Sequence, residues 1–235
     1  MLREKIKRVG YQKEVIYTED HWKLLKEKRT IALKYMEKIS YLSPIVHGSI
    51  ARGDIHKNSD IDIVLLRPVP SYKILSALNI DSNYEIWIIQ ATPKHTPKVK
   101  IVIPDNIFLT YPLLEFMELE HQFYKFGGLL TLDELKKDKR VAGVNKKLLL
   151  IKPTKYGHVE ISAIENPSLV ASIVGVNLGI VEERIRVLRR RDEIGRTGIF
   201  LKVPVPPDKS PEQVFDTLLA RKPTLRRLLR KRGEL

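Results

Sequence analysis

The sequence predicts an α+β fold, in which a group of strands and helices is followed by a basic, mainly helical C-terminal part. In residues 18–39 the later apolar side chains recur at spacings of three and four, which is typical of an amphipathic helix. Apolar runs at 45–48, 60–66 and 84–90 are rich in β-branched residues and predict strands. The last third of the chain combines helical patterns with many arginines.

Start and stop signals separate the N-terminal elements. Acidic residues 19 and 20 mark the start of the first helix, and Ser43-Pro44 separates it from the first strand. A turn at 57–59 precedes the second strand, and two prolines at 68 and 70 end it. A short helix expected over 71–78 leads to the third strand.

The middle of the chain gives a weaker pattern. Residues 98–103 alternate in polarity and predict a strand, whereas a helix is expected over 111–126 and ends at Gly127-Gly128. Residues 147–162 predict a β-hairpin with a glycine in its loop.

The composition excludes several classes of protein. The chain has 235 residues, of which 43% are hydrophobic and 30% are charged, as in soluble globular proteins. It contains no cysteine, so disulfides, zinc–thiolate sites and cysteine nucleophiles are excluded. No apolar run is long enough for a membrane span, and the N-terminus lacks the apolar core of a signal peptide. We therefore expect a cytoplasmic protein that has no membrane role.

The charge is unevenly distributed. The net charge is +14, and residues 141–235 contain 19 Lys and Arg against 10 Asp and Glu. A basic balance of this kind favours a polyanionic partner such as RNA or DNA, although a solubilising surface charge is the alternative.

The most informative stretch is 46–66, where Asp60-Ile61-Asp62-Ile63 opens an apolar run. Strand side chains alternate between faces, so Asp60 and Asp62 project from one face. Two neighbouring carboxylates repel each other unless a cation lies between them, and Mg²⁺ prefers carboxylates together with phosphate oxygens. An ordinary strand with two exposed aspartates is the simpler reading of this pair.

Upstream of this pair, Gly48-Ser49 marks the point where a strand should turn into a helix. Such a turn exposes backbone N–H groups and the positive end of a helix dipole, which suits a phosphate group.

An apolar residue, Gly-Ser, a gap of about ten residues and Asp-Ile-Asp-Ile together resemble the signature of the DNA polymerase β superfamily of nucleotidyltransferases. The string Gly-Ser-Ile-Ala-Arg-Gly, continuing to Asn-Ser-Asp-Ile-Asp, is most similar to its minimal (MNT) members. This resemblance covers residues 20–90. It implies a mixed sheet with flanking helices, an NTP substrate and transfer of NMP to a hydroxyl acceptor with release of pyrophosphate.

The resemblance also implies a site. Two Mg²⁺ ions, with Mn²⁺ as an alternative, would be held by Asp60, Asp62 and a third carboxylate from a later strand. Glu85 falls at that place, although this superfamily often has Asp there; an exposed glutamate at a strand end is the other reading, and Asp81 and Asp105 are weaker candidates. The expected nucleotide contacts are Gly48, Ser49, Arg52 and Lys57, of which the last two also suit a solvated loop.

The C-terminal part contains a second pattern. Two helices over 169–174 and 180–191, with Gly175 in the turn, are similar to a helix-turn-helix, and residues 195–198 followed by a strand over 199–204 would supply the wing of a winged helix. A helical pair used for packing or dimerisation is the alternative. A proline-rich linker leads to a basic amphipathic tail at 211–235, which either binds phosphates or is a solvated end. The candidate nucleic-acid contacts are Arg184, Arg189, Arg190, Arg226, Arg227 and Arg230.

These patterns predict two domains: a nucleotidyltransferase domain at 1–145, with its signature at 46–89, and a basic domain at 146–235, winged-helix-like over 166–204. Three functions remain open. The first is metal-dependent NMP transfer to an acceptor that includes nucleic acid. The second is nucleic-acid binding on an inactive nucleotidyltransferase scaffold. The third is NMP transfer to a protein or small molecule. The sequence leaves the NTP, the acceptor and the oligomeric state undetermined.

Overall fold

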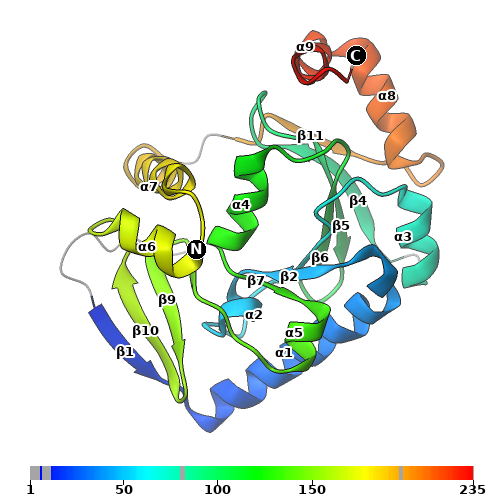
Figure 1. Cartoon of the computed structure of the whole chain (residues 1–235). Coiled ribbons are helices and arrows are strands. Elements are labelled where there is room, and N and C mark those ends of the chain that lie inside the picture. The colour runs from blue at the N-terminus through cyan, green and yellow to red at the C-terminus, as the bar shows by residue number, and fades with distance from the viewer. Residues whose placement is uncertain (1–5, 7–11, 80–82, 196–197, 235) are drawn as a thin grey trace.

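A computed structural model describes residues 6, 12–79, 83–195 and 198–234. Within this part of the chain, the strands form one seven-stranded sheet and one four-stranded sheet. Helices lie on both faces of the large sheet, and the small sheet lies at one end of the molecule beside α6 and α7 (Figure 1). The predicted α+β class is confirmed.

The large sheet has the strand order β11-β4-β5-β6-β3-β2-β7. Only the β3–β6 pair is parallel among its pairs of described strands, so the sheet is mixed. Its strands are β2 (Ile45–His47), β3 (Ile61–Val64), β4 (Glu85–Gln90), β5 (Lys98–Ile103), β6 (Ile107–Pro112), β7 (Leu129–Thr131) and β11 (Leu201–Pro204). The small sheet contains β1 (Gln12–Ile16), β10 (Gly157–Ser162), β9 (Leu149–Thr154) and β8 (Gly143–Val144) in that order.

The helices are α1 (Glu19–Lys38), α2 (Ser49–Arg52), α3 (Ser71–Leu78), α4 (Glu118–Phe126), α5 (Leu132–Lys136), α6 (Pro167–Val174), α7 (Leu178–Glu193), α8 (Pro211–Arg221) and α9 (Pro223–Arg232), with a short 3₁₀ helix η1 (Ser40–Leu42). The predicted helices over 18–39 and 71–78 correspond to α1 and α3. The Thr18 side chain caps α1 by accepting a hydrogen bond from the backbone of His21.

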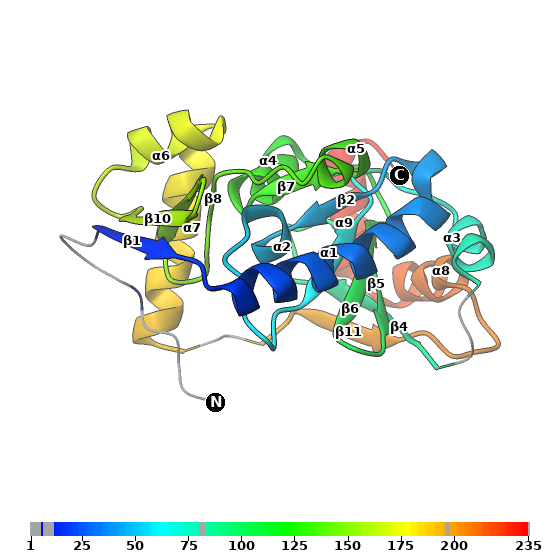
Figure 2. The same cartoon turned by 90° about the horizontal axis from the view of Figure 1, so that it is seen from below.

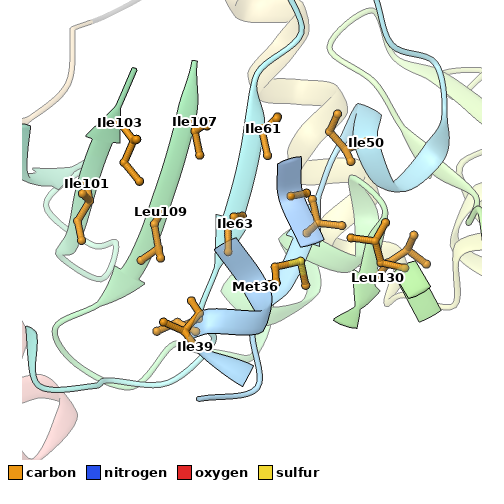
Figure 3. Packing of buried hydrophobic residues seen from close by; sticks show 14 of the residues in the cluster. Met36, Ile39, Ile50, Ile61, Ile63, Ile101, Ile103, Ile107, Leu109 and Leu130 are labelled. Carbon is orange, nitrogen blue, oxygen red and sulfur yellow. The ribbon is translucent and has the colours of Figure 1, made fainter. Parts of the chain in front are cut away.

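One face of the large sheet forms the main hydrophobic core against α1. Because side chains alternate along each strand, Ile61 and Ile63 of β3 point to this face together with apolar residues of β5 and β6. Met36 and Ile39 cover them, and α1 runs along the sheet (Figures 2 and 3). Burial of this apolar face fixes the register of β3, so the polar residues of the same strand must face the other side.

The opposite face of the large sheet carries α4. Tyr124 of α4 and Phe116, which precedes this helix, pack on Ile45 and Val64. The helix predicted over 111–126 is therefore only partly correct. Residues 107–112 form β6, because they alternate between buried and half-buried positions and pair with both β3 and β5.

The described residues of the C-terminal part do not form a separate winged-helix domain. The helical pair α6–α7 is present, with Gly175 at a φ of 70° in the turn, but the segment proposed as its wing is β11. This strand pairs with β4 at the edge of the large sheet, and the wing residues 196 and 197 lie outside the described residues.

The predicted boundary at 145/146 does not separate two structural units. The N-terminal strand β1 belongs to the small sheet, where it pairs with β10 of the confirmed hairpin. Conversely, α8 and α9 pack on the large sheet through Phe215 and Leu225 against Ile88. In the part of the chain that the structure describes, no helix is both long and apolar enough to cross a membrane.

Candidate active site

Asp60 and Asp62 lie at the start of β3, on the face opposite the main core. Both side chains are partly exposed, whereas the intervening Ile61 is buried. The Ile61 backbone N–H donates to the Asn106 carbonyl at 2.9 Å, which fixes this end of β3 beside β6. The pair of carboxylates therefore projects from a rigid strand, as the sequence predicted.

The local electrostatics leave this pair short of positive charge. Burial raises the pKa of Asp62, and the charge of Asp60 raises it further, because both effects disfavour a second negative charge. Lys100 and Lys146 lower the same pKa without reversing the shift. Negative charge thus remains at this end of β3, which is what a divalent cation would neutralise.

The Gly48-Ser49 turn lies next to the pair. Antiparallel pairing sets His47 opposite Asp62, so the turn that follows β2 reaches the start of β3. Gly48 has a φ of 81°, and a Cβ added there would meet no atom within 4 Å, so the space beside this residue is open. Its N–H donates to the Gly128 carbonyl at 2.8 Å, which ties the turn to the start of β7.

His47 does not supply the missing charge. Burial and the nearby Arg52 lower the pKa of His47 to about 3, so its imidazole is neutral at physiological pH. Its Nδ1 lies 3.0 Å from the Tyr124 carbonyl oxygen and donates to it. His47 therefore connects the strand to α4 as a neutral hydrogen-bond donor.

The two predicted loop contacts differ. The Arg52 side chain is only 7% exposed and donates to both carboxylate oxygens of Asp54, at 2.9 and 3.0 Å, and to the Gly127 carbonyl. Three of its five N–H donors are used internally, so Arg52 holds the loop, and its contact with a phosphate stays a prediction. Lys57 is exposed in the loop before β3, where a nucleotide can reach it.

The structure does not bring Glu85 to the carboxylate pair. Two strands separate β4 from β3, and the registers set Glu85 opposite Val102, Val102 opposite Phe108 and Phe108 opposite Asp62. At a spacing of ~4.8 Å per strand, Glu85 lies about 14 Å from Asp62 along this row. It accepts a hydrogen bond from the Trp87 indole at 3.0 Å instead. Glu85 therefore lies too far from Asp62 to be the third ligand that the sequence predicted.

No other acid takes that place among the described residues, since no group of three or more His, Cys, Asp or Glu side chains is arranged to hold a metal. Asp105 is exposed in the β5–β6 turn, and Asp81 lies outside the described residues. The position beside Asp62 on the neighbouring strand belongs to Phe108.

Two lysines that the sequence did not single out lie close to the pair. Lys100 projects from the site face of β5, and its Nζ is 3.4 Å from the centroid of the Phe108 ring. Burial lowers the pKa of Lys100, whereas Asp62 and Asp60 raise it. Lys146 is exposed in the loop between β8 and β9 and interacts electrostatically with Asp62. The alternation of Lys98, Val99 and Lys100 signals one basic face, but only the strand order shows that this face adjoins Asp62.

A depression of about 360 Å³ lies beside the site at the same edge of the sheet. It is lined by Asn83, Tyr84, Glu85, Val102, Ile103, Pro104, Asp105, Asn106 and Phe108. Since Asn106 pairs with Ile61 and Phe108 with Asp62, this depression begins next to the carboxylates.

The arginines predicted to bind nucleic acid do not form one surface. Arg184 is largely buried over the Phe123 ring, at 5.0 Å, and Arg226 donates to the Leu219 and Ala220 carbonyls at the end of α8. Four others are exposed, namely Arg189 and Arg190 on α7 and Arg227 and Arg230 on α9. These helices pack on different neighbours, α7 on α4 and α6, and α9 on α8 (Figure 1).

A pair of carboxylates at the start of a strand therefore lies beside a Gly-Ser turn that opens a helix. The family comparison agrees: the model of the nucleotidyltransferase domain matches residues 32–175, and the chain belongs to this family. The match covers β2, α2 and β3 and is consistent with a polymerase β-like nucleotidyltransferase. Comparisons with curated proteins and with solved structures gave no match.

Proposed function

We propose that the protein transfers NMP from an NTP to a hydroxyl acceptor and that Asp60 and Asp62 form the reactive centre. The observation that carries this proposal is the proximity of the carboxylate pair to the Gly48-Ser49 turn at the start of β3. This proximity would place a binding site for a phosphate group next to a binding site for a cation.

The residues present fit one divalent cation. Asp60 and Asp62 offer two hard oxygen ligands, and the raised pKa of Asp62 reflects burial and a repulsion that a cation would relieve. A bound Mg²⁺ or Mn²⁺ would neutralise phosphate charge that develops during transfer. The two-ion site expected from the sequence lacks its third carboxylate, so the proposal here includes one ion.

The proposed reaction is an in-line displacement. The acceptor oxygen forms a bond to the α-phosphorus, the bond to the α–β bridging oxygen breaks, and pyrophosphate leaves with that oxygen. The proton of the acceptor hydroxyl passes to water. The backbone N–H and the hydroxyl of Ser49 orient the phosphates, and Lys57 adds charge from the loop.

Nucleic acid is the acceptor class that the charge favours. The net charge of +14 and the exposed arginines of α7 and α9 suit a polyanion. The depression that begins at Phe108 has the size and polarity for a terminal nucleoside. Transfer to a protein or small molecule is the competing outcome of the same assay.

One observation favours a second candidate function. Because Phe108 lies where a third ligand would be needed, the domain would also suit a scaffold that binds nucleotide or nucleic acid without transfer. The two candidates differ in pyrophosphate release. Incubation with each of the four NTPs, Mg²⁺ and total RNA should release pyrophosphate from at least one NTP. Nucleotide binding without release from any NTP and any acceptor would support the scaffold instead.

A further inference from the structure

We infer that the Lys100 ammonium takes the place of the second divalent ion and binds the NTP phosphates beside a single ion held by Asp60 and Asp62. This inference rests on the proposed function and states which positive groups balance the negative charge of the NTP phosphates in that site. It starts from three neighbouring strands of the large sheet, β3, β6 and β5.

The sheet register brings Lys100 to the site. Lys100 pairs with Thr110 of β6, and Thr110 pairs with Val64 of β3, so all three residues share the face of Asp62. The long Lys100 side chain extends from β5 to Phe108 on the neighbouring strand β6, where its Nζ lies 3.4 Å from the ring centroid. Phe108 is the residue directly beside Asp62.

Among the described residues, the site offers no third carboxylate for a second ion. A phenyl ring cannot coordinate Mg²⁺, which requires oxygen ligands. In the described residues, the acidic side chains do not form a group of three that could hold a metal. A second divalent ion would also lie beside the fixed charge of Lys100, which repels it. A lysine beside a single ion supplies positive charge where the second ion would act.

The other lysines nearby are less suited to this role. Lys98 lies on the same strand, but its Nζ is 3.4 Å from the Tyr124 hydroxyl and packs against the rings of Phe116 and Tyr124. Lys146 is exposed in a loop. Lys100 is half-buried on a strand, so its ammonium has a defined position.

A purely structural role for Lys100 is the alternative, since a lysine over an aromatic ring can simply stabilise the sheet. Lys202 provides the matched control. Its Nζ lies 4.2 Å from the Trp87 ring centroid on β11 and β4, farther from the carboxylates. Substitution of either lysine by Met removes a similar cation–π contact, but only Lys100→Met removes a charge next to the site.

The test measures nucleotide affinity and bound ions instead of turnover. The α,β-methylene analogues of the four nucleoside triphosphates are titrated with Mn²⁺, and bound Mn²⁺ is counted by electron paramagnetic resonance. Wild type should bind one Mn²⁺ per nucleotide. Lys100→Met should weaken nucleotide binding about tenfold, as expected for loss of a charge-assisted hydrogen bond, and Lys202→Met by less than about twofold. Equal effects of the two substitutions would overturn the role of Lys100.

A double variant tests the count of ions directly. Lys100→Met combined with Phe108→Asp supplies a carboxylate beside Asp62 and removes the competing ammonium, so a second Mn²⁺ should bind. Two ions in wild type would overturn the inference and leave the proposed function standing. Failure of wild type to bind any analogue would overturn both. Circular dichroism establishes whether each variant is folded. If the double variant does not fold, the number of Mn²⁺ ions bound by wild type alone tests the inference: one ion supports it and two ions overturn it.

Discussion

Asp62 on β3 and Phe108 on β6 lie side by side in register across the parallel strand pair of the large sheet. This relationship sets the character of the site. One neighbour of the carboxylate is an aromatic ring that carries no charge, and the other, His47 on β2, is a neutral imidazole. Lys100 and Lys146 lower the pKa of Asp62 without reversing its upward shift, so the Asp60–Asp62 pair retains capacity for a cation.

Asp62→Asn should abolish NMP transfer without destabilising the fold. Burial and Asp60 raise the pKa of Asp62 in the folded state, so its ionised form disfavours folding above that pKa. The amide removes this cost, and the melting temperature at pH 7 should stay equal or rise by about 2–4 °C per kcal/mol gained. The gain should shrink as pH falls, because Asp62 then becomes protonated. Thermal unfolding at several pH values, with Asp208→Asn in an exposed turn as control, checks this; a lower melting temperature for Asp62→Asn contradicts it.

Gly48→Ala should destabilise the protein and weaken nucleotide binding. A Cβ at Gly48 meets no atom within 4 Å, but the φ of 81° is unfavourable for alanine and costs about 1–2 kcal/mol. Gly198→Ala is the matched control, since its added Cβ also meets nothing and no positive φ is involved. Urea unfolding should separate the two variants. Equal stabilities would show that the turn at Gly48 carries no conformational requirement.

Arg52→Met should cost about 3–5 kcal/mol of stability, because it leaves the Asp54 carboxylate buried without its partner. The double variant Arg52→Met/Asp54→Leu should recover part of that loss. Lys57→Met, in the exposed loop, should change stability by less than about 0.5 kcal/mol. Denaturant unfolding measures all three variants. A stable Arg52→Met protein with weakened nucleotide binding would support Arg52 as a phosphate contact.

Glu212→Gln should loosen the contact between α8 and α3. Glu212 accepts hydrogen bonds from both the backbone N–H and the hydroxyl of Ser71, each at 2.7 Å, and so caps α3 from a distant helix. Burial alone raises the pKa of Glu212, but these hydrogen bonds outweigh it and lower the pKa below 4.5. The ionised Glu212 carboxylate therefore adds about 1 kcal/mol to the free energy of unfolding. This contribution is complete above pH 4.5 and is lost as the pH falls through the pKa of Glu212 in the folded state. Asp216→Asn, exposed on the same helix, is the control variant, and urea unfolding at several pH values compares the two.

Arg227→Gln/Arg230→Gln should reduce the salt dependence of RNA binding. Deletion of the tail is a poor test, because Leu225 and Leu229 are buried and Arg232 donates to the Thr96 hydroxyl at 2.9 Å. Each lost phosphate contact should lower the slope of log K against log salt by about 0.7–0.9. Affinity for a single-stranded RNA is measured between low and physiological salt. An unchanged slope would exclude α9 from the interface.

The sequence predicted local elements well and long-range neighbours poorly. The Gly48-Ser49 turn and the Asp60–Asp62 strand depend on residues within a short stretch, so their pattern was sufficient. Glu85 was misassigned because the β5–β6 hairpin lies between β4 and β3, although β4 comes first in the chain. Strand order depends on pairing between distant segments, which a single sequence does not encode locally.

The same limit explains two further differences. Residues 201–204 look like a wing because they follow a helical pair, but β11 completes the edge of the large sheet. Arg52 looks like a phosphate contact because it follows the Gly-Ser turn, but Asp54 and Gly127 use three of its donors. Neither partner choice is visible in the spacing of residues.

Transfer of labelled NMP tests the central claim most directly. The protein is incubated with each α-labelled NTP, Mg²⁺ and total cellular RNA or protein, and the labelled product is separated by size and by nuclease or protease sensitivity. Wild type should label an acceptor with at least one NTP, and Asp60→Asn should label none while retaining its fold. Label that persists at the wild-type level in Asp60→Asn, or no label with any NTP and acceptor, would contradict the assignment of Asp60 and Asp62 as the reactive centre.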